Sequence, residues 1–178
     1  MASMPLVTPL AMPLAIYLES NPSKVGVLVK DIQEKITFLH DKEISVGPEH
    51  LDPAKILVVE SSEGPRVILT IQKEGSAFKA QDDIRAAGKL FRTLWTSGSR
   101  VPDFLESDLI SKMTQDDTTM TASEASRHFA FWSSSKRLSF LKKVSDILEL
   151  KQKKHLEAVE ADSRSAKLFK IMASIFFF

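Results

Sequence analysis

Residues that could act as bases or metal ligands are spread along this chain instead of being grouped. The chain has four histidines, namely His40, His50, His128 and His155. None of them has a second histidine three or four residues away, which is the spacing that helical metal sites use. Two pairs of adjacent carboxylates also occur, Asp82-Asp83 and Asp116-Asp117, but neighbouring side chains on a helix point about 100° apart. We therefore predict no metal site and interpret these acids as solvated charge.

Nucleophiles and phosphate-binding loops are also missing from the sequence pattern. The chain has no cysteine, so disulfide bonds, thiolate metal sites and cysteine nucleophiles are excluded. Its 6 glycines form neither a phosphate-binding loop nor a dinucleotide fingerprint, and no serine stands in a nucleophile elbow. We therefore expect no catalytic residue and no cofactor.

The segment from Lys136 to Lys170 concentrates positive charge. It holds ten basic and five acidic residues, which gives a net charge of +5 in a chain whose total is +1. Such a segment could bind phosphate backbones, because basic side chains release condensed counterions. The interspersed acids are also typical of an ordinary solvated helix face. The candidate nucleic-acid-binding residues are Lys136, Arg137, Lys142, Lys143, Lys151, Lys153 and Lys154.

The last eight residues, Ile171 to Phe178, form the most apolar end of the chain. Phe176, Phe177 and Phe178 would expose a considerable apolar patch if nothing covered them. Three interpretations remain open: the end docks in the core of its own chain, it enters a groove on a partner, or the chain stops within a helix. We take the three phenylalanines as candidate partner-binding residues.

A β-hairpin over residues 55–71 is the element around which the rest of the chain is expected to fold. Ile56 to Val59 and Val67 to Ile71 are short, mostly β-branched runs, and the polar link between them contains Gly64-Pro65. Both runs are nearly continuous in apolar character, so we expect helices to cover the sheet.

The elements before the hairpin alternate between extended and helical patterns. The prolines of Met4 to Pro13 predict an extended arm, and Leu14 to Leu18 a short strand. Asn21-Pro22 is a helix-start signal, and apolar spacing continues that helix to His40. Polar and apolar residues alternate from Glu43 to Gly47, which predicts an edge strand.

Helices dominate after the hairpin. We expect a second long helix from Ala77 to about Gly98, and strand signals stop beyond Pro102. The later helices are expected over 104–113, from a capping box at Thr121–Glu124 through Trp132, and over 136–159. The sequence thus predicts an α/β or α+β fold, with a small α/β domain over 1–98 and a helical domain over 102–178.

Composition fits a soluble protein of the cell interior. Hydrophobic residues make up 43% of the chain and charged residues 26%, which is ordinary for a globular protein. The first 18 residues contain no Lys or Arg, so the charged start of a secretory signal is missing. No apolar run is long enough to cross a bilayer, and we expect a cytoplasmic location, with the nucleus as an alternative.

The predicted order of elements resembles the glutathione-transferase-like arrangement, in which a thioredoxin-like half precedes a helical half. Pro53 stands just ahead of the hairpin, as a proline does in that family. The stretch from Ser123 to Trp132 is similar to the first helix of the second half in truncated versions attached to aminoacyl-tRNA synthetases and elongation factors. Gly75-Ser76 replaces the acidic-Ser dipeptide that binds glutathione, and only Ser20 could activate a thiol. The resemblance therefore implies a docking domain.

The function expected from the sequence is a non-catalytic protein–protein interaction module, such as a scaffold or adaptor subunit. Its partner would be another protein or a second copy of the chain. One alternative is a nucleic-acid or nucleoprotein-binding factor that uses the basic segment 136–170. A second alternative is a glutathione-dependent transferase that uses Ser20 and Ser76.

Overall fold

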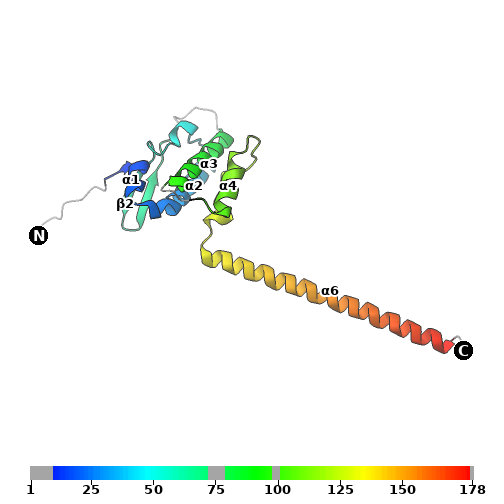
Figure 1. The fold of residues 1–178 in the computed structure, drawn as a ribbon. Helices are drawn as coiled ribbons and strands as arrows, with labels where there is room; N and C mark the ends of the chain where they lie inside the picture. The colour runs from blue at the N-terminus through cyan, green and yellow to red at the C-terminus, as the bar shows by residue number, and fades with distance from the viewer. Residues whose placement is uncertain (1–9, 72–78, 98–100, 177–178) are drawn as a thin grey trace, which may run out of the picture. The chain divides into compact units, whose positions relative to one another are not determined.

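The structure is a computed structural model, which describes residues 10–71, 79–97 and 101–176, with the side chains of Leu156 and of residues 159–176 left out (Figure 1). The first part of the chain consists of β1 (Met12–Pro13), α1 (Leu14–Ser20), η1 (Pro22–Lys24), α2 (Val25–His40), η2 (Pro48–His50), β2 (Leu57–Ser61) and β3 (Gly64–Ile68). It is followed by α3 (Ala80–Thr96), α4 (Phe104–Thr114), α5 (Ala122–Ser126), η4 (Phe129–Phe131) and α6 (Ser134–Phe176).

The chain divides into two units, Met1–Trp132 and Ser133–Phe178. The first unit is a small antiparallel sheet with helices, which confirms the predicted α+β class. The second unit consists of α6, the longest helix among the described residues. No helix in the described part of the chain is both long and apolar enough to span a membrane.

The predicted hairpin is confirmed, and β2 is the central strand of a sheet with the order β1-β2-β3. The prediction that Gly64-Pro65 lies in the turn was wrong, because both residues belong to β3. A two-residue turn leads from Ser61 to its partner Gly64, which has a φ of 110° that glycine adopts without strain. Pro65 is tolerated because β3 is an edge strand.

Helix α2 closes the open side of β3. The backbone N–H of Val67 donates to Asp31 of α2 at 2.6 Å instead of pairing with β2, and Pro65 has no N–H to offer. These two features leave fewer free donors on the edge, where unpaired donors would invite pairing with another strand.

Two predicted strands are wrong, and each error has a local cause. Leu14 to Leu18 forms α1 instead, because Leu14, Tyr17 and Leu18 lie three and four residues apart and are buried together. The segment from Glu43 to Gly47 is an irregular loop whose polar groups bind α3. The helix predicted at Asn21 does form, but the Asn21 side chain donates to the Tyr17 carbonyl at 3.1 Å instead of capping.

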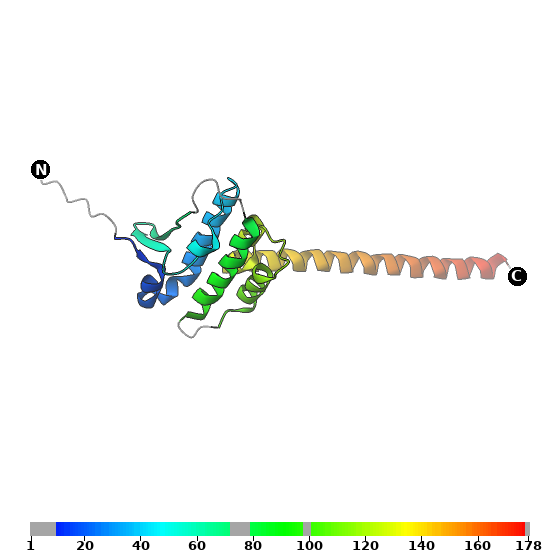
Figure 2. The ribbon, with the colours of Figure 1, turned by 90° about the horizontal axis from the view of Figure 1, so that it is seen from above.

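The helices of the first unit stack side by side from the sheet outward, with α2 next to the sheet, α3 next to α2 and α4 beyond α3 (Figure 2). Their facing sides form one hydrophobic cluster, whose fully buried members include Leu28, Ile32, Ile84, Phe91, Leu109 and Met113. Because α4 and α5 belong to this cluster too, the predicted boundary at residues 98–102 does not separate two hydrophobic cores.

The predicted capping box at the start of α5 is confirmed. The Thr121 side chain accepts from the Glu124 amide at 3.1 Å, and the Glu124 carboxylate accepts from the Thr121 amide at 2.8 Å. The helix is shorter than predicted and ends at Ser126. Phe131 follows in η4 and packs edge-on against Phe91 of α3, with ring centroids 6.3 Å apart.

Candidate functional site

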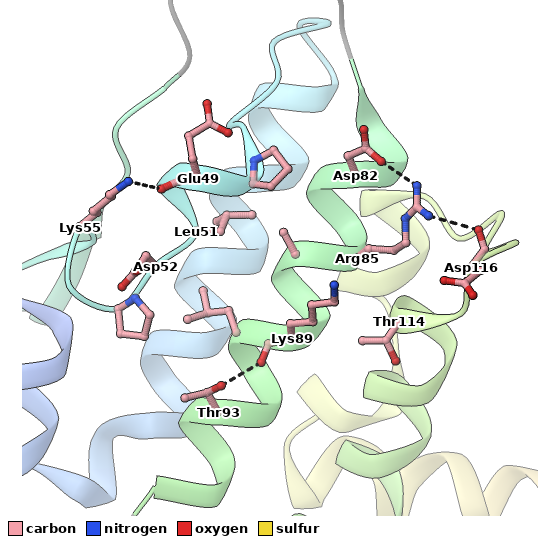
Figure 3. Close-up of a pocket in the computed structure, with 14 residues that line it drawn as sticks. Glu49, Leu51, Asp52, Lys55, Asp82, Arg85, Lys89, Thr93, Thr114 and Asp116 are labelled. Carbon is pink, nitrogen blue, oxygen red and sulfur yellow. Dashed lines mark hydrogen bonds and ion pairs between the residues drawn. The ribbon is translucent and has the colours of Figure 1, made fainter.

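The first unit carries an open cavity of about 680 Å³ between α3, the loop that precedes β2 and the turn after α4 (Figure 3). Leu51, Ala86 and Leu90 contribute its apolar lining. Its charged lining residues mix both signs and are Glu49, Asp52, Lys55, Asp82, Arg85, Lys89 and Asp116.

Several polar groups of this cavity are held by neighbours within it. Lys55 donates from Nζ to the Glu49 carbonyl at 2.7 Å. Arg85 donates to the Asp82 carboxylate at 2.6 Å and to the Asp116 carbonyl at 3.3 Å, as the dashed lines in Figure 3 show. The described lining includes no histidine, serine or tyrosine. Its two hydroxyls donate to backbone carbonyls, that of Thr93 to Lys89 at 3.2 Å and that of Thr114 to Ile110 at 2.8 Å, so neither donates to a side-chain base that would activate it.

Asp82 and Asp83 do point apart as predicted, but Asp83 is not solvated. Asp83 is fully buried, and its carboxylate accepts from the amides of Val46 and Gly47 at 2.8 and 2.9 Å. The Ser45 hydroxyl donates at 2.8 Å, and His40 Nε2 lies 3.0 Å away. Burial raises the pKa of Asp83, but the four hydrogen bonds outweigh it and hold the pKa below its ordinary value. Asp83 therefore fixes the 43–47 loop on α3.

The histidines of the first unit also serve the fold. His128 accepts from the Ala130 amide through Nδ1 at 3.2 Å, so its proton is on Nε2, which lies 2.9 Å from Asp108. Bonds from Lys112 and His128 lower the pKa of Asp108. Nε2 of His50 lies 3.6 Å from Oε1 of the neighbouring Glu49. No group of three metal-ligating side chains occurs among the described residues.

Tyr17 is the one tyrosine of the chain, and it joins α1 to β2. It is buried, and its hydroxyl donates to the Glu60 carboxylate. This hydrogen bond, together with burial and the charge of Glu60, raises the pKa of Tyr17 to about 12.

Helix α6 presents a continuous apolar face in its first half. The side chains that form this apolar face are Phe140, Leu141, Val144, Ile147 and Leu148. Their separations of three, four, seven and eight residues place them on one side of an α-helix. Leu141, Ile147 and Leu148 are 62%, 54% and 60% exposed. Among the described residues of the second unit, no other element is present to cover these three side chains.

The predicted nucleic-acid-binding residues all lie on α6, and Lys142, Lys143, Lys151, Lys153 and Lys154 are exposed. They do not form one stripe. Lys142 and Lys153 belong to a row of residues three or four apart whose intervening members, Asp146 and Glu149, are acidic. Lys136, Lys143 and Lys154 lie on a different side of the helix, next to the apolar face.

The other predicted site residues remain predictions. Phe176 is the last residue of α6, but its side chain, like Phe177 and Phe178, lies outside the described residues. Ser76 also lies outside them. Ser20 is the last residue of α1 and is exposed. In place of the strand that the glutathione-transferase resemblance expects at Leu14–Leu18, the structure has a helix.

The chain matches no protein-family model, and comparison with curated proteins and with solved structures gives no significant relative.

Proposed function

We propose that this protein is a non-catalytic protein–protein interaction module and that the apolar face of α6 is its binding element. The observation that carries the proposal is the exposure of Leu141, Ile147 and Leu148 on one side of a helix that forms a unit by itself. Burying a leucine or isoleucine side chain completely is worth about 1.5–3 kcal/mol. A partner that covers this face would therefore gain several such contributions.

The length of α6 supports the same interpretation. In proteins most helical stability comes from packing an amphipathic face rather than from intrinsic propensity. The 43 residues of α6 have that face in their first half, and the described part of their own unit holds no second element to pack against it. A protein surface that receives the helix would supply the missing packing, as in helix-in-groove recognition.

A catalytic role has less support. The cavity of the first unit is lined by charged groups, several of which bind one another, and the buried Asp83 is engaged by four donors. An adaptor role needs only a folded unit and an exposed apolar face, and the exposed side chains of α6 support such a role.

A matched pair of double variants tests the proposal. Leu141→Glu with Leu148→Glu places two charges on the apolar face, and we expect the tagged chain to capture at least about tenfold less partner. Ser135→Glu with Ser139→Glu adds the same charge on the opposite side of the helix and should capture as much as the unchanged chain. Equal capture by both variants would contradict the proposal.

Nucleic-acid binding is the second candidate, favoured by the exposed lysines of α6. It predicts an affinity for RNA or DNA that falls steeply between low and moderate salt. Reversing the charge of Lys142, Lys143, Lys153 and Lys154 would abolish that binding, whereas the two leucine substitutions would leave it in place. The acids between Lys142 and Lys153 favour the protein partner.

A further inference from the structure

The first half of α6 combines an apolar face with a surplus of basic residues, and this combination restricts the kind of partner. Residues 136–154 include seven basic and two acidic side chains. Basic amphipathic helices of this type are typical of targets of acidic helix-binding proteins and of membrane-surface helices. The arrangement of the side chains on α6 distinguishes between a helix-binding protein and a membrane surface as the partner.

The apolar face has the spacing of anchors that insert into a groove. Phe140, Val144 and Ile147 are four and three residues apart, so they lie above one another over about two turns. Leu141 and Leu148 widen the face on one side. Leu141, Val144 and Leu148 supply apolar anchors three, four and seven residues apart, which is the spacing that helix-in-groove partners bind.

The side of α6 opposite its apolar face carries charges of both signs. Every residue from Leu138 to His155 is exposed except Val144, which is half-buried. A membrane-surface helix presents one face to lipid and an opposite face rich in Lys and Arg. In α6 the side opposite the apolar face contains Asp146 and Glu149 between Lys142 and Lys153. This mixed-charge side favours a protein partner over a lipid surface.

We infer that α6, over residues 136–154, is a target helix for an acidic calcium sensor of the EF-hand class. This inference rests on the proposed interaction function and names the partner of the same face. Calcium opens such sensors and exposes grooves lined with methionine, which adapt to differently shaped apolar anchors. Their acidic surfaces complement Lys143 and Lys154 beside the apolar face.

The test is a titration of the full-length chain with calmodulin, a sensor of this class, in the presence of calcium and again with a chelator. We expect saturable binding with calcium and binding weaker by roughly 100-fold without it, because only the open sensor offers its grooves.

Two matched leucine pairs locate the binding face. Leu141→Ala with Leu148→Ala removes apolar anchors and should weaken binding by roughly 30-fold. Leu138→Ala with Leu150→Ala is the same chemical change, but each of these residues lies six positions from Val144 and is turned about 120° away from it. This second pair should weaken binding less than about threefold.

Three outcomes would overturn the inference: no binding to calmodulin, equal binding with and without calcium, or equal loss for both leucine pairs. Saturable binding to anionic phospholipid vesicles in place of calmodulin would also overturn it. The proposed interaction function does not depend on calmodulin. It would survive any of these results if the unchanged chain captured a protein that the Leu141→Glu, Leu148→Glu variant did not. The interaction function and the calcium-sensor inference can therefore fail separately.

Discussion

At the scale of single residues, the buried polar groups of this protein hold its parts together. Asp83 accepts from Ser45, Val46 and Gly47 and so attaches a loop to α3. Tyr17 attaches α1 to β2 through Glu60. Such contacts replace hydrogen bonds to water that each group loses on burial, and a buried donor or acceptor left without its partner costs about 1–3 kcal/mol.

The ionisation of the Tyr17 phenol can be measured directly, because the chain has no other tyrosine. We expect an ultraviolet titration of the folded protein to show phenol ionisation with a pKa of about 12, compared with about 10 in an unfolded chain. Because the folded pKa is the higher one, the stabilisation is complete below about pH 10 and is lost as the pH rises toward 12.

The control is Glu60→Gln, which removes the charged acceptor and should move the midpoint down toward the ordinary tyrosine value. Circular dichroism at each pH establishes that the chain is still folded. A midpoint near the unfolded value in a folded chain would show that the Tyr17–Glu60 hydrogen bond does not form.

The residue-level prediction that succeeded joins partners that are close in the chain. The capping box joins Thr121 to Glu124, three positions apart, and each side chain has one backbone target. The partner of Tyr17 lies 43 residues away and those of Asp83 lie 36 to 43 residues away, so no local pattern indicates them. Asp83 was interpreted as solvated for this reason.

At the scale of elements, periodicity predicted the long helices and failed on short apolar segments. Helices α2, α3 and α4 have enough turns for their spacing to be unambiguous. Leu14 to Leu18 is too short for that, since five apolar residues fit a strand or a helix equally well. The packing of α1 against the core decides between them.

The contact between α3 and α4 depends on the absence of a side chain at Gly88. A Cβ there would lie 2.8 Å from Met113 Cβ and 2.8 Å from a methyl carbon of Thr114. We therefore expect Gly88→Ala to lower the free energy of unfolding by about 1–3 kcal/mol, measured by urea denaturation, because the helices would have to move apart.

Gly26 provides the matched control in α2. A Cβ at Gly26 meets nothing within 4 Å, so Gly26→Ala should raise the free energy of unfolding by about 0.5–1 kcal/mol through helix propensity alone. A Gly88→Ala variant as stable as Gly26→Ala would mean that α3 and α4 are not in close contact at this point.

At the scale of the whole molecule, charge and exposed apolar surface both concentrate beyond residue 133. The sequence indicated the basic segment and the long helix, because charge and helical spacing are local properties. It did not indicate that Leu141, Ile147 and Leu148 would be exposed, because exposure depends on which elements share a unit with them. The proposed function rests on that structural finding.

The most direct test of the account is photo-crosslinking of the intact chain in its own cells. A photoreactive, diazirine-bearing leucine analogue would be placed at position 148 on the apolar face or at position 139 on the opposite side. The account predicts a discrete crosslinked protein from position 148 and at most about a tenth as much from position 139, because diazirines react only with groups in contact. Crosslinks to RNA, or equal protein crosslinks from both positions, would contradict it.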